Sequence, residues 1–101
     1  MVAFANRVSV PAHVLIRHLD GESVLLNLET ERYFGLDAMG TRMWETTTSS
    51  PNLEAAYRKL LDEFEVEPEV LRNHLTGLLS QLVENGLLSL FPADVGSIQA
   101  V

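Results

Sequence analysis

The side chains of this sequence best suited to chemistry are three histidines and one carboxylate-rich segment. Imidazole nitrogens and carboxylates bind metal ions and transfer protons, but only where the fold brings them together. His13 and His18 are an odd number of residues apart in one predicted strand, so they should point to opposite faces of a sheet. His74 lies on a predicted helix about three turns from Glu84, too far for both to hold one ion. We therefore expect no metal site.

The carboxylates of residues 61–69, LDEFEVEPE, alternate with apolar residues that belong to a core. This pattern is typical of the solvated end of a helix rather than of an acid–base pair. The sequence contains no cysteine, which excludes a thiolate nucleophile, a thiolate metal site and a disulfide. It also lacks a glycine-rich phosphate loop, a nucleophile elbow and a His-Glu-x-x-His motif. We expect a protein that is not an enzyme and that uses no cofactor.

The charge balance narrows the range of partners. Seven Lys and Arg stand against 14 Asp and Glu, which leaves a net charge of −7. Nucleic-acid binders and proteins of anionic membranes usually carry a basic surface, so we expect neither partner. No apolar run reaches the roughly 20 residues that span a bilayer, and the first residues do not resemble a signal peptide. The expected location is the cytoplasm.

The 101 residues suffice for one domain with a modest core, predicted over residues 13–91. Residues 1–12 show no clear pattern and are interpreted as a flexible or loosely docked arm, and residues 92–101 as a tail. Residues 13–19, 23–28 and 32–36 read as strands. Asp20-Gly21 predicts a tight hairpin turn, because glycine takes a positive φ easily, and residues 29–31 form a second turn. In the second strand, residues 24, 26 and 28 make one face apolar throughout. The result is a three-stranded antiparallel meander.

Three helices should follow this meander. Asp37 is a good N-cap for a helix that starts at Ala38 and ends within residues 46–50, TTTSS. Ser50 and Pro51 are expected to begin a second helix, whose apolar stripe runs from residue 53 to residue 64. Pro68 opens a third helix with an unusually wide apolar surface, which ends at Asn85-Gly86. Residues 87–91 then form a short strand or an extension of the helix.

The predicted order is therefore three strands followed by three helices. A small sheet cannot stand alone in water, so the helices must cover one of its faces. The fold class is α+β, winged-helix-like, with a three-stranded antiparallel sheet followed by three helices.

The most suggestive feature of this arrangement is geometric. The strand at residues 32–36 is last in the meander, and it carries no proline, inward charge or bulge to block its outer edge. An open edge beside an apolar groove can take up a peptide as an additional strand. Val70, Leu79 and Val83 widen the apolar surface of the third helix, which could form the second wall of such a groove. These side chains could equally enter the core or a dimer interface.

The stretch VLLNLETERYFGLDAMGTRMWE, residues 24–45, resembles the PqqD-like family, the domains called RiPP recognition elements. The resemblance spans residues 13–91 and rests on an ordered set of residues: Tyr33, Phe34, Leu36, Gly40, Met43, Trp44, Phe64, Val66, Gly86, Leu87 and Leu88. Two positions depart from the pattern. Glu31 replaces a usual glycine, which puts the turn geometry in doubt, and Asp37 replaces an asparagine, which is an equivalent cap.

The resemblance implies a function in peptide recognition. Such domains bind the leader segment of a ribosomally made precursor peptide as an added strand and present the precursor to a modifying or leader-cleaving enzyme. The chain looks most like the stand-alone recognition subunit of lasso-peptide systems, which works with a leader peptidase. An alternative is the peptide chaperone of PQQ biosynthesis, which serves a radical-SAM enzyme.

The residues expected to contact the leader come from the last strand and the third helix. On the strand, the backbone would supply the hydrogen bonds, Tyr33 would border a side-chain pocket, and Phe34 and Leu36 would anchor the core. On the helix, Arg72 would pair with an acidic leader residue. The predicted set is Arg32, Tyr33, Phe34, Gly35, Leu36, Val70, Arg72, Asn73, Thr76, Leu79 and Val83.

Two other classes of protein share this architecture. A winged-helix DNA-binding protein would need base- and phosphate-contacting residues on its last helix. That helix offers only Arg72, Asn73, His74 and Gln81 among acidic residues. A structural or dimerising subunit without a peptide partner is the second rival, and a homodimer is left open.

Overall fold

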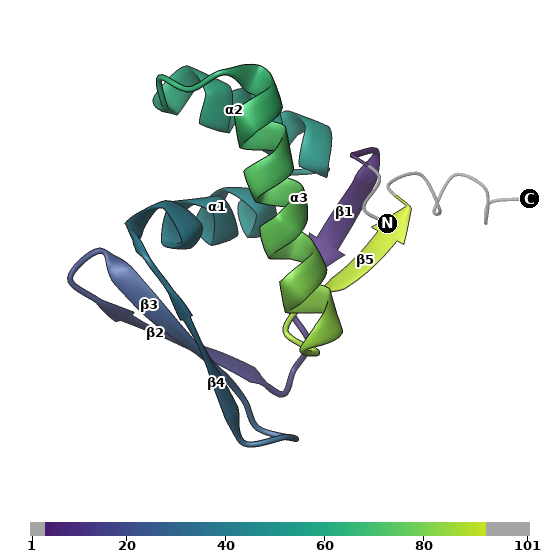
Figure 1. Cartoon of the computed structure of the whole chain (residues 1–101). Coiled ribbons are helices and arrows are strands. Elements are labelled where there is room, and N and C mark those ends of the chain that lie inside the picture. Colours follow the sequence, from purple (N-terminus) through teal and green to yellow (C-terminus); the bar gives the residue numbers. More distant parts are fainter. Residues whose placement is uncertain (1–3, 93–101) are drawn as a thin grey trace, which may run out of the picture.

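The computed structural model describes residues 4–92 and shows two small antiparallel sheets around three helices (Figure 1). The α+β fold class is confirmed, with a three-stranded sheet followed by three helices. The elements are β1 (Asn6–Ser9), β2 (Val14–Leu19), β3 (Glu22–Asn27), β4 (Arg32–Leu36), α1 (Ala38–Ser49), α2 (Leu53–Glu63), α3 (Pro68–Glu84) and β5 (Ser89–Pro92).

The meander has the predicted order, β2-β3-β4, and both of its turns use left-handed backbone. Asp20 and Gly21 have φ values of 50° and 83°, as a hairpin turn with two positive φ angles requires. Glu31 has a φ of 61°, so it adopts the left-handed conformation that a glycine would take more easily. Its backbone N–H donates to the carbonyl of Asn27 at 2.7 Å, which closes this turn. Glu31 therefore holds this turn in a left-handed conformation, at a cost of about 1 kcal/mol.

The N-terminal segment departs from the prediction. Residues 1–12 were expected to form a flexible or loosely docked arm, but Asn6–Ser9 form β1, which pairs antiparallel with β5. Phe4 is buried in the core, and its carbonyl accepts a hydrogen bond from the backbone of Glu54 at 2.8 Å. The arm interpretation is corrected for residues 4–9, while residues 1–3 lie outside the described part of the chain. So do residues 93–101, which make up all but the first residue of the expected tail.

The helix boundaries follow local capping. Asp37 Oδ1 accepts from the Gly40 backbone at 2.7 Å, which confirms the predicted cap of α1. The second helix does not begin at Ser50-Pro51. Its N-cap is Asn52, whose Oδ1 accepts from the backbone of Ala55 at 2.8 Å. Ser50 instead closes α1, because its hydroxyl donates to the carbonyl of Thr46 at 2.6 Å.

The boundaries of α3 and the start of β5 also agree with local sequence signals. Pro68 occupies the first turn of α3, as predicted. Gly86 ends this helix with a φ of 70°, the left-handed conformation expected there. Of the two expectations for residues 87–91, the short strand is the correct one, because β5 begins at Ser89.

α1 and α3 lie on one side of the β2-β3-β4 sheet, and the core lies between the helices and that face (Figure 1). α1 packs on β3 and β4, whereas α2 packs on α1, α3 and β1 on the side away from this sheet. The largest fully buried side chains are leucines: Leu25, Leu53, Leu60, Leu71, Leu75, Leu79, Leu82 and Leu87. We refer below to the sheet face under the helices as the inner face and to the opposite one as the outer face.

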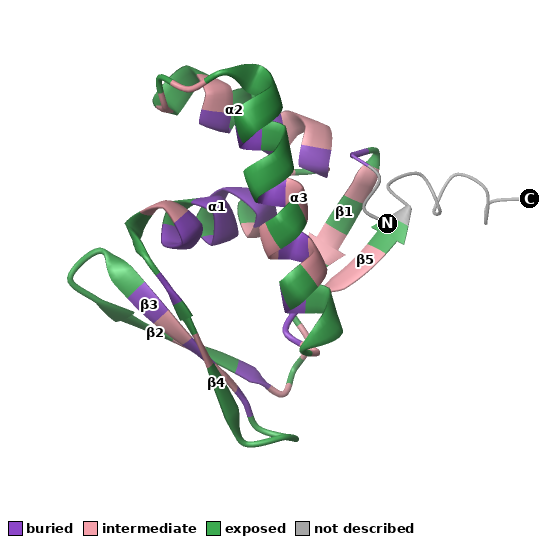
Figure 2. Ribbon diagram, in the orientation of Figure 1, coloured by how far each residue is buried: buried purple, intermediate pink, exposed green. Residues whose placement is uncertain are grey.

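β3 turns its more polar face inward. Ser23, Leu25 and Asn27 are 2%, 0% and 3% exposed, whereas Val24 and Leu26 are only half-buried on the outer face (Figure 2). The apolar face of this strand noted in the sequence is therefore the outer one. The two buried polar residues are hydrogen-bonded. The Ser23 and Thr41 hydroxyls are 2.7 Å apart, and Asn27 Nδ2 donates to the carbonyl of Asn85 at 2.9 Å.

Candidate functional site

The outer edge of β4 is the strongest candidate for an interaction site. Among residues 4–92, β4 pairs only with β3, so its other edge presents free backbone N–H and C=O groups. Phe34 packs against the core and Leu36 is buried in it, which confirms their predicted role as anchors. Tyr33 and Gly35 point to the other face, and Tyr33 is 73% exposed. Core packing of Phe34 and Leu36 thus fixes the position of β4 on its inner face, while the outer edge of the strand stays unpaired.

An apolar hollow lies at the carboxyl end of β4. It has a volume of about 210 Å³, and its lining comes from the start of α1 and the middle of α3: Asp37, Met39, Gly40, Met43, His74 and Leu78. Gly40 lets the start of α1 pack closely against the end of β4, because a Cβ at this position would lie 3.2 Å from Asp37 Oδ1 and 3.3 Å from the Leu36 side chain. A volume of this size suits one aliphatic or aromatic side chain.

A larger and more polar hollow lies at the other end of β4. It has a volume of about 630 Å³, and its lining joins the turn before β4 to the end of α3: His13, Asn27, Glu29, Thr30, Arg32, Glu84, Asn85 and Gly86. His13 Nε2 lies 3.0 Å from the Gly86 carbonyl, and Asn27 bonds to Asn85, so the end of α3 is tied to the sheet. The open edge of β4 therefore runs from a polar hollow to an apolar one.

The rotation of α3 decides which of its side chains border this edge. Its buried stripe consists of Leu71, Leu75, Leu79 and Leu82. His74 and Leu78 flank that stripe on the side of the apolar hollow beside β4. Sequence reasoning missed both in this role, since His74 was considered as a metal ligand or a DNA contact and Leu78 as part of the core stripe. The signal that could have found them is their position one step to one side of the buried stripe at 3.6 residues per turn.

The predicted wall residues lie mainly elsewhere. Leu79 is 1% exposed and packs in the core, so the expectation that it lines a groove is wrong. The guanidinium of Arg72 lies 4.1 Å from the centre of the Phe4 ring and 4.9 Å from that of Tyr57, with Glu54 at 3.7 Å. Arg72 therefore stabilises the contact between α2, α3 and the N-terminal segment.

The places of the other four predicted helix positions follow from the same rotation. Thr76 and Val83 share the flank of Arg72, because one helical turn separates Arg72 from Thr76 and two further turns lead to Val83. Asn73 is exposed to solvent, and Val70 is exposed near the start of α3. The structure thus brings together the β4 residues of the predicted set but not its helical residues.

One ion pair away from this edge has a structural role. The side chain of Arg42 donates to Glu63 at 2.6 Å and so links α1 to α2. This hydrogen bond raises the pKa of Arg42 above its ordinary value. Within residues 4–92, no group of three His, Asp or Glu side chains is placed to hold a metal ion. No helix of the described chain is long and apolar enough to cross a membrane.

These features define a small α+β domain, in which an unpaired strand edge runs beside a helix. The chain belongs to the PqqD family, because the family model described as coenzyme PQQ synthesis protein D (PqqD) matches residues 22–88. The matched range begins with β3 and ends after α3, so it contains the whole open edge and the helix beside it.

Two solved structures share the fold. The first is described as TbiB1 in complex with the TbiA(beta) leader peptide. It is 33% identical, with a TM-score of 0.71 over 79% of this chain and 93% of that chain. The second, described as lasso peptide synthetase B1 complexed with the leader peptide, is 21% identical, with a TM-score of 0.71 over 82% and 98% of the two chains. At that identity the second likeness supports the fold alone. A comparison with curated proteins finds no match.

Proposed function

We propose that this protein binds the leader segment of a ribosomally synthesised precursor peptide and presents the precursor to a modifying or leader-cleaving enzyme. The observation that carries the proposal is the unpaired edge of β4 in a domain whose structural neighbour TbiB1, 33% identical, is a complex with a leader peptide. The leader adds a strand to β4 through main-chain hydrogen bonds, and alternate side chains enter the hollows beside the strand.

The two hollows give the site its selectivity. The backbone of Arg32–Leu36 provides main-chain hydrogen bonds, which do not by themselves distinguish one leader sequence from another. A leader side chain in the apolar hollow would contact Leu78 and the side of His74. At the other end, a polar leader residue would meet Arg32 in the polar hollow. An added strand with two or three buried anchors can supply the roughly −8 kcal/mol that corresponds to a micromolar Kd.

In this proposal the protein does no chemistry on the peptide. Its role is to raise the local concentration of the precursor at an enzyme and to hold it in one register. The favoured enzyme is a leader peptidase of the lasso-peptide type. A second candidate is a radical-SAM enzyme of PQQ biosynthesis, which the description of the matching family model favours.

The direct test is a titration of isotope-labelled protein with a synthetic leader from the companion precursor. Amide shifts should concentrate on Arg32–Leu36 and on α3 near His74 and Leu78, with a Kd of order micromolar. Backbone N-methylation at successive leader positions should weaken binding at every second position, because alternate N–H groups of an added strand point at β4. If saturating leader leaves the β4 amides unmoved, the proposal is wrong.

A matched pair of variants distinguishes the two flanks of α3. Leu78→Ala removes a wall of the apolar hollow and should weaken leader binding by about tenfold. Val83→Ala, on the opposite flank of the same helix, should leave the Kd unchanged. Thermal unfolding of both variants checks that each is folded at the temperature of the titration. Equal losses in both variants would place the leader somewhere other than the hollow.

A further inference from the structure

Residues 4–13 make contacts near both ends of α3, and we call this segment the N-terminal strap. Its strand, β1, pairs with β5 from Asn6 opposite Pro92 to Ser9 opposite Ser89. β5 follows α3 after a short turn, so the strap fixes the strand that continues the helix (Figure 1). The family model matches residues 22–88 and therefore contains neither β1 nor β5. Membership of the family thus does not account for the strap.

The first anchor of the strap lies near the start of α3. The buried Phe4 ring packs edge-on against Tyr57, with ring centres 5.5 Å apart and ring planes at 74°. The Arg72 guanidinium lies 4.1 Å from the centre of the Phe4 ring and 4.9 Å from that of Tyr57. The Tyr57 hydroxyl donates to the Pro68 carbonyl at 3.0 Å. Because a cation is attracted to an aromatic face, this cluster connects the first turns of α3 to α2 and to the strap.

The second anchor lies at the end of α3, in the polar hollow. His13 Nε2 lies 3.0 Å from the Gly86 carbonyl, and its Nδ1 lies 3.7 Å from a carboxylate oxygen of Glu29 in the turn before β4. A carbonyl oxygen only accepts, so Nε2 carries a proton in this contact. A neutral imidazole then turns a bare Nδ1 towards the carboxylate, whereas the protonated ring donates to both partners. His13 therefore joins α3 to this turn most firmly when it is protonated.

The two anchors lie on either side of the part of α3 that borders the open edge. His74 and Leu78 line the apolar hollow, and both lie between Arg72 and the end of the helix. Hollows separate α3 from the two ends of β4, so the spacing between helix and strand depends on how α3 is held elsewhere. A wall that is fixed before binding need not be ordered by the peptide. The affinity falls in proportion to the fraction of molecules in which the wall is out of place.

We propose that the N-terminal strap sets the spacing between α3 and β4 and so controls the affinity for the leader, with His13 as a positioning residue that tightens the site when it is protonated. This inference rests on the proposed function. Phe4 and His13 act through α3 rather than through contact with the peptide. Leader binding and protonation of His13 favour the same arrangement, so by thermodynamic linkage each strengthens the other.

The first test compares the full-length wild type with His13→Gln in titrations with the synthetic leader at several pH values. Glutamine keeps an amide donor for the Gly86 carbonyl but does not titrate. The Kd of the variant divided by that of the wild type should rise from about one at about pH 8 to about three at about pH 5.5, since a partly exposed ion pair has a modest effect. A ratio that stays constant or falls towards low pH overturns the role of His13.

The ratio isolates His13 because the other charged or titratable groups around the two hollows are common to both proteins. These groups are Glu29, Arg32, Asp37, His74 and Glu84. Their titration, and that of the leader itself, therefore affects both Kd values alike.

The second test uses two arginines that face the same glutamate. Arg72 and Arg58 lie 3.7 Å and 3.3 Å from carboxylate oxygens of Glu54, and Arg72 also covers the Phe4 ring. Arg72→Met keeps an apolar stem but removes the cation, and it should weaken leader binding by about threefold. Arg58→Met removes the same charge beside Glu54 and should leave the Kd unchanged. Thermal unfolding checks that both variants are folded, and equal Kd values would show that the first anchor does not control the site.

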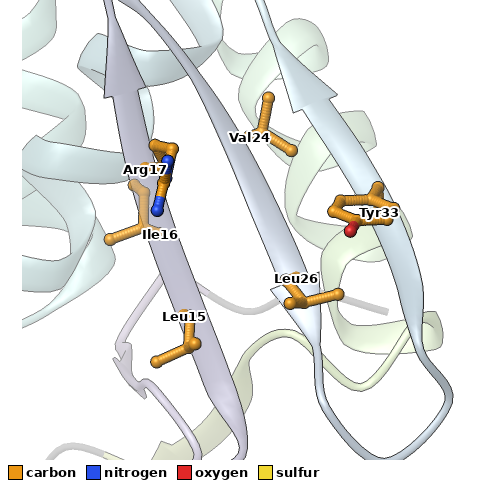
Figure 3. A pocket seen from close by; sticks show the side chains of 6 residues that line it. All are labelled: Leu15, Ile16, Arg17, Val24, Leu26 and Tyr33. Carbon is orange, nitrogen blue, oxygen red and sulfur yellow. The ribbon is translucent and has the colours of Figure 1, made fainter.

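A distance measured without leader separates this inference from the proposed function. The sequence contains no cysteine, so two introduced cysteines can carry spin labels. Tyr33→Cys places one label on the outer face of β4 (Figure 3), and Gly77→Cys places the other at an exposed position of α3. The distribution of label distances should widen in Arg72→Met but not in Arg58→Met.

An unchanged distribution in Arg72→Met overturns the inference. At about pH 5.5, His13→Gln should also show a wider distribution than the wild type. If the distributions widen as expected while the wild type binds no leader, the strap positions α3 and the proposed function is the part that fails.

Discussion

The inner and outer faces of the β2-β3-β4 sheet reverse the usual relation between polarity and burial. On β3, the inner face carries Ser23 and Asn27 around Leu25, and all three are almost completely buried. The outer face carries Val24 and Leu26, which are only half-buried. Since strand residues alternate between faces, the chain could bury only one of these sets, and it buries the one with more polar atoms.

The comparison shows that a strand can bury its more polar face when every polar side-chain atom on that face has a hydrogen-bond partner. Asn27 Oδ1 accepts from the backbones of Glu29 at 2.9 Å and Thr30 at 3.2 Å, while its Nδ2 donates to the carbonyl of Asn85. Ser23 is paired with Thr41. A satisfied polar group costs little to bury, and these bonds tie the sheet to α1 and to the end of α3. The apolar outer face then stays uncovered within the described chain.

The largest expected effect is on the inner face. Leu25→Ala should lower the free energy of unfolding by about 3–4 kcal/mol, because it leaves a cavity under α1. Leu26→Ala, the neighbouring position on the outer face, should cost about 1 kcal/mol or less, since its side chain is only half-buried. Urea unfolding of both variants gives the comparison. Similar losses would show that the two faces are equally packed.

A somewhat smaller effect is expected for the amide that connects the sheet to α3. Asn27→Ala should cost about 2–3 kcal/mol, because it removes three hydrogen bonds and leaves the Asn85 carbonyl without this donor. Asn27→Asp keeps the acceptor for residues 29 and 30 but loses the donor, so its stability should fall between those of Ala and wild type. A stability of Asn27→Asp below that of Asn27→Ala would contradict the account of this network.

The hydroxyl pair between β3 and α1 should contribute less. Ser23→Ala should cost about 1–2 kcal/mol, because it deprives the buried Thr41 hydroxyl of its shorter hydrogen bond. Thr41→Val and the double variant complete a mutant cycle measured by thermal unfolding. A coupling energy close to zero would mean that the two hydroxyls act independently.

The smallest effect on stability is expected on the outer face. Leu15→Thr should change the free energy of unfolding by less than about 0.5 kcal/mol, because the side chain is largely exposed and threonine is favoured in strands. Differential scanning calorimetry would detect a larger change. A loss comparable to that of Leu25→Ala would mean that the outer face supports the fold of the isolated chain.

Sequence reasoning was most successful where the signal is local. The turn at Asp20-Gly21, the cap at Asp37 and the left-handed Gly86 each depend on the conformation of a few neighbouring residues, and all three are confirmed. The start of α2 was placed too early, because Ser50 and Asn52 are both good caps and only the packing of α1 decides between them. The candidate site follows the same division, since the predicted β4 residues lie along the open edge, whereas most of the predicted helical residues lie away from it.

By itself the sequence determined the order of β2, β3, β4 and the three helices, the open edge of β4 and membership of the PqqD family. These depend on spacing, capping and motif residues that act over short distances. The tertiary structure alone decided three further features: the pairing of β1 with β5, the rotation of α3 that turns His74 and Leu78 towards β4, and the burial of the Ser23–Asn27 face. Each depends on contacts between distant parts of the chain. The energy of such contacts cannot be inferred from a local sequence pattern.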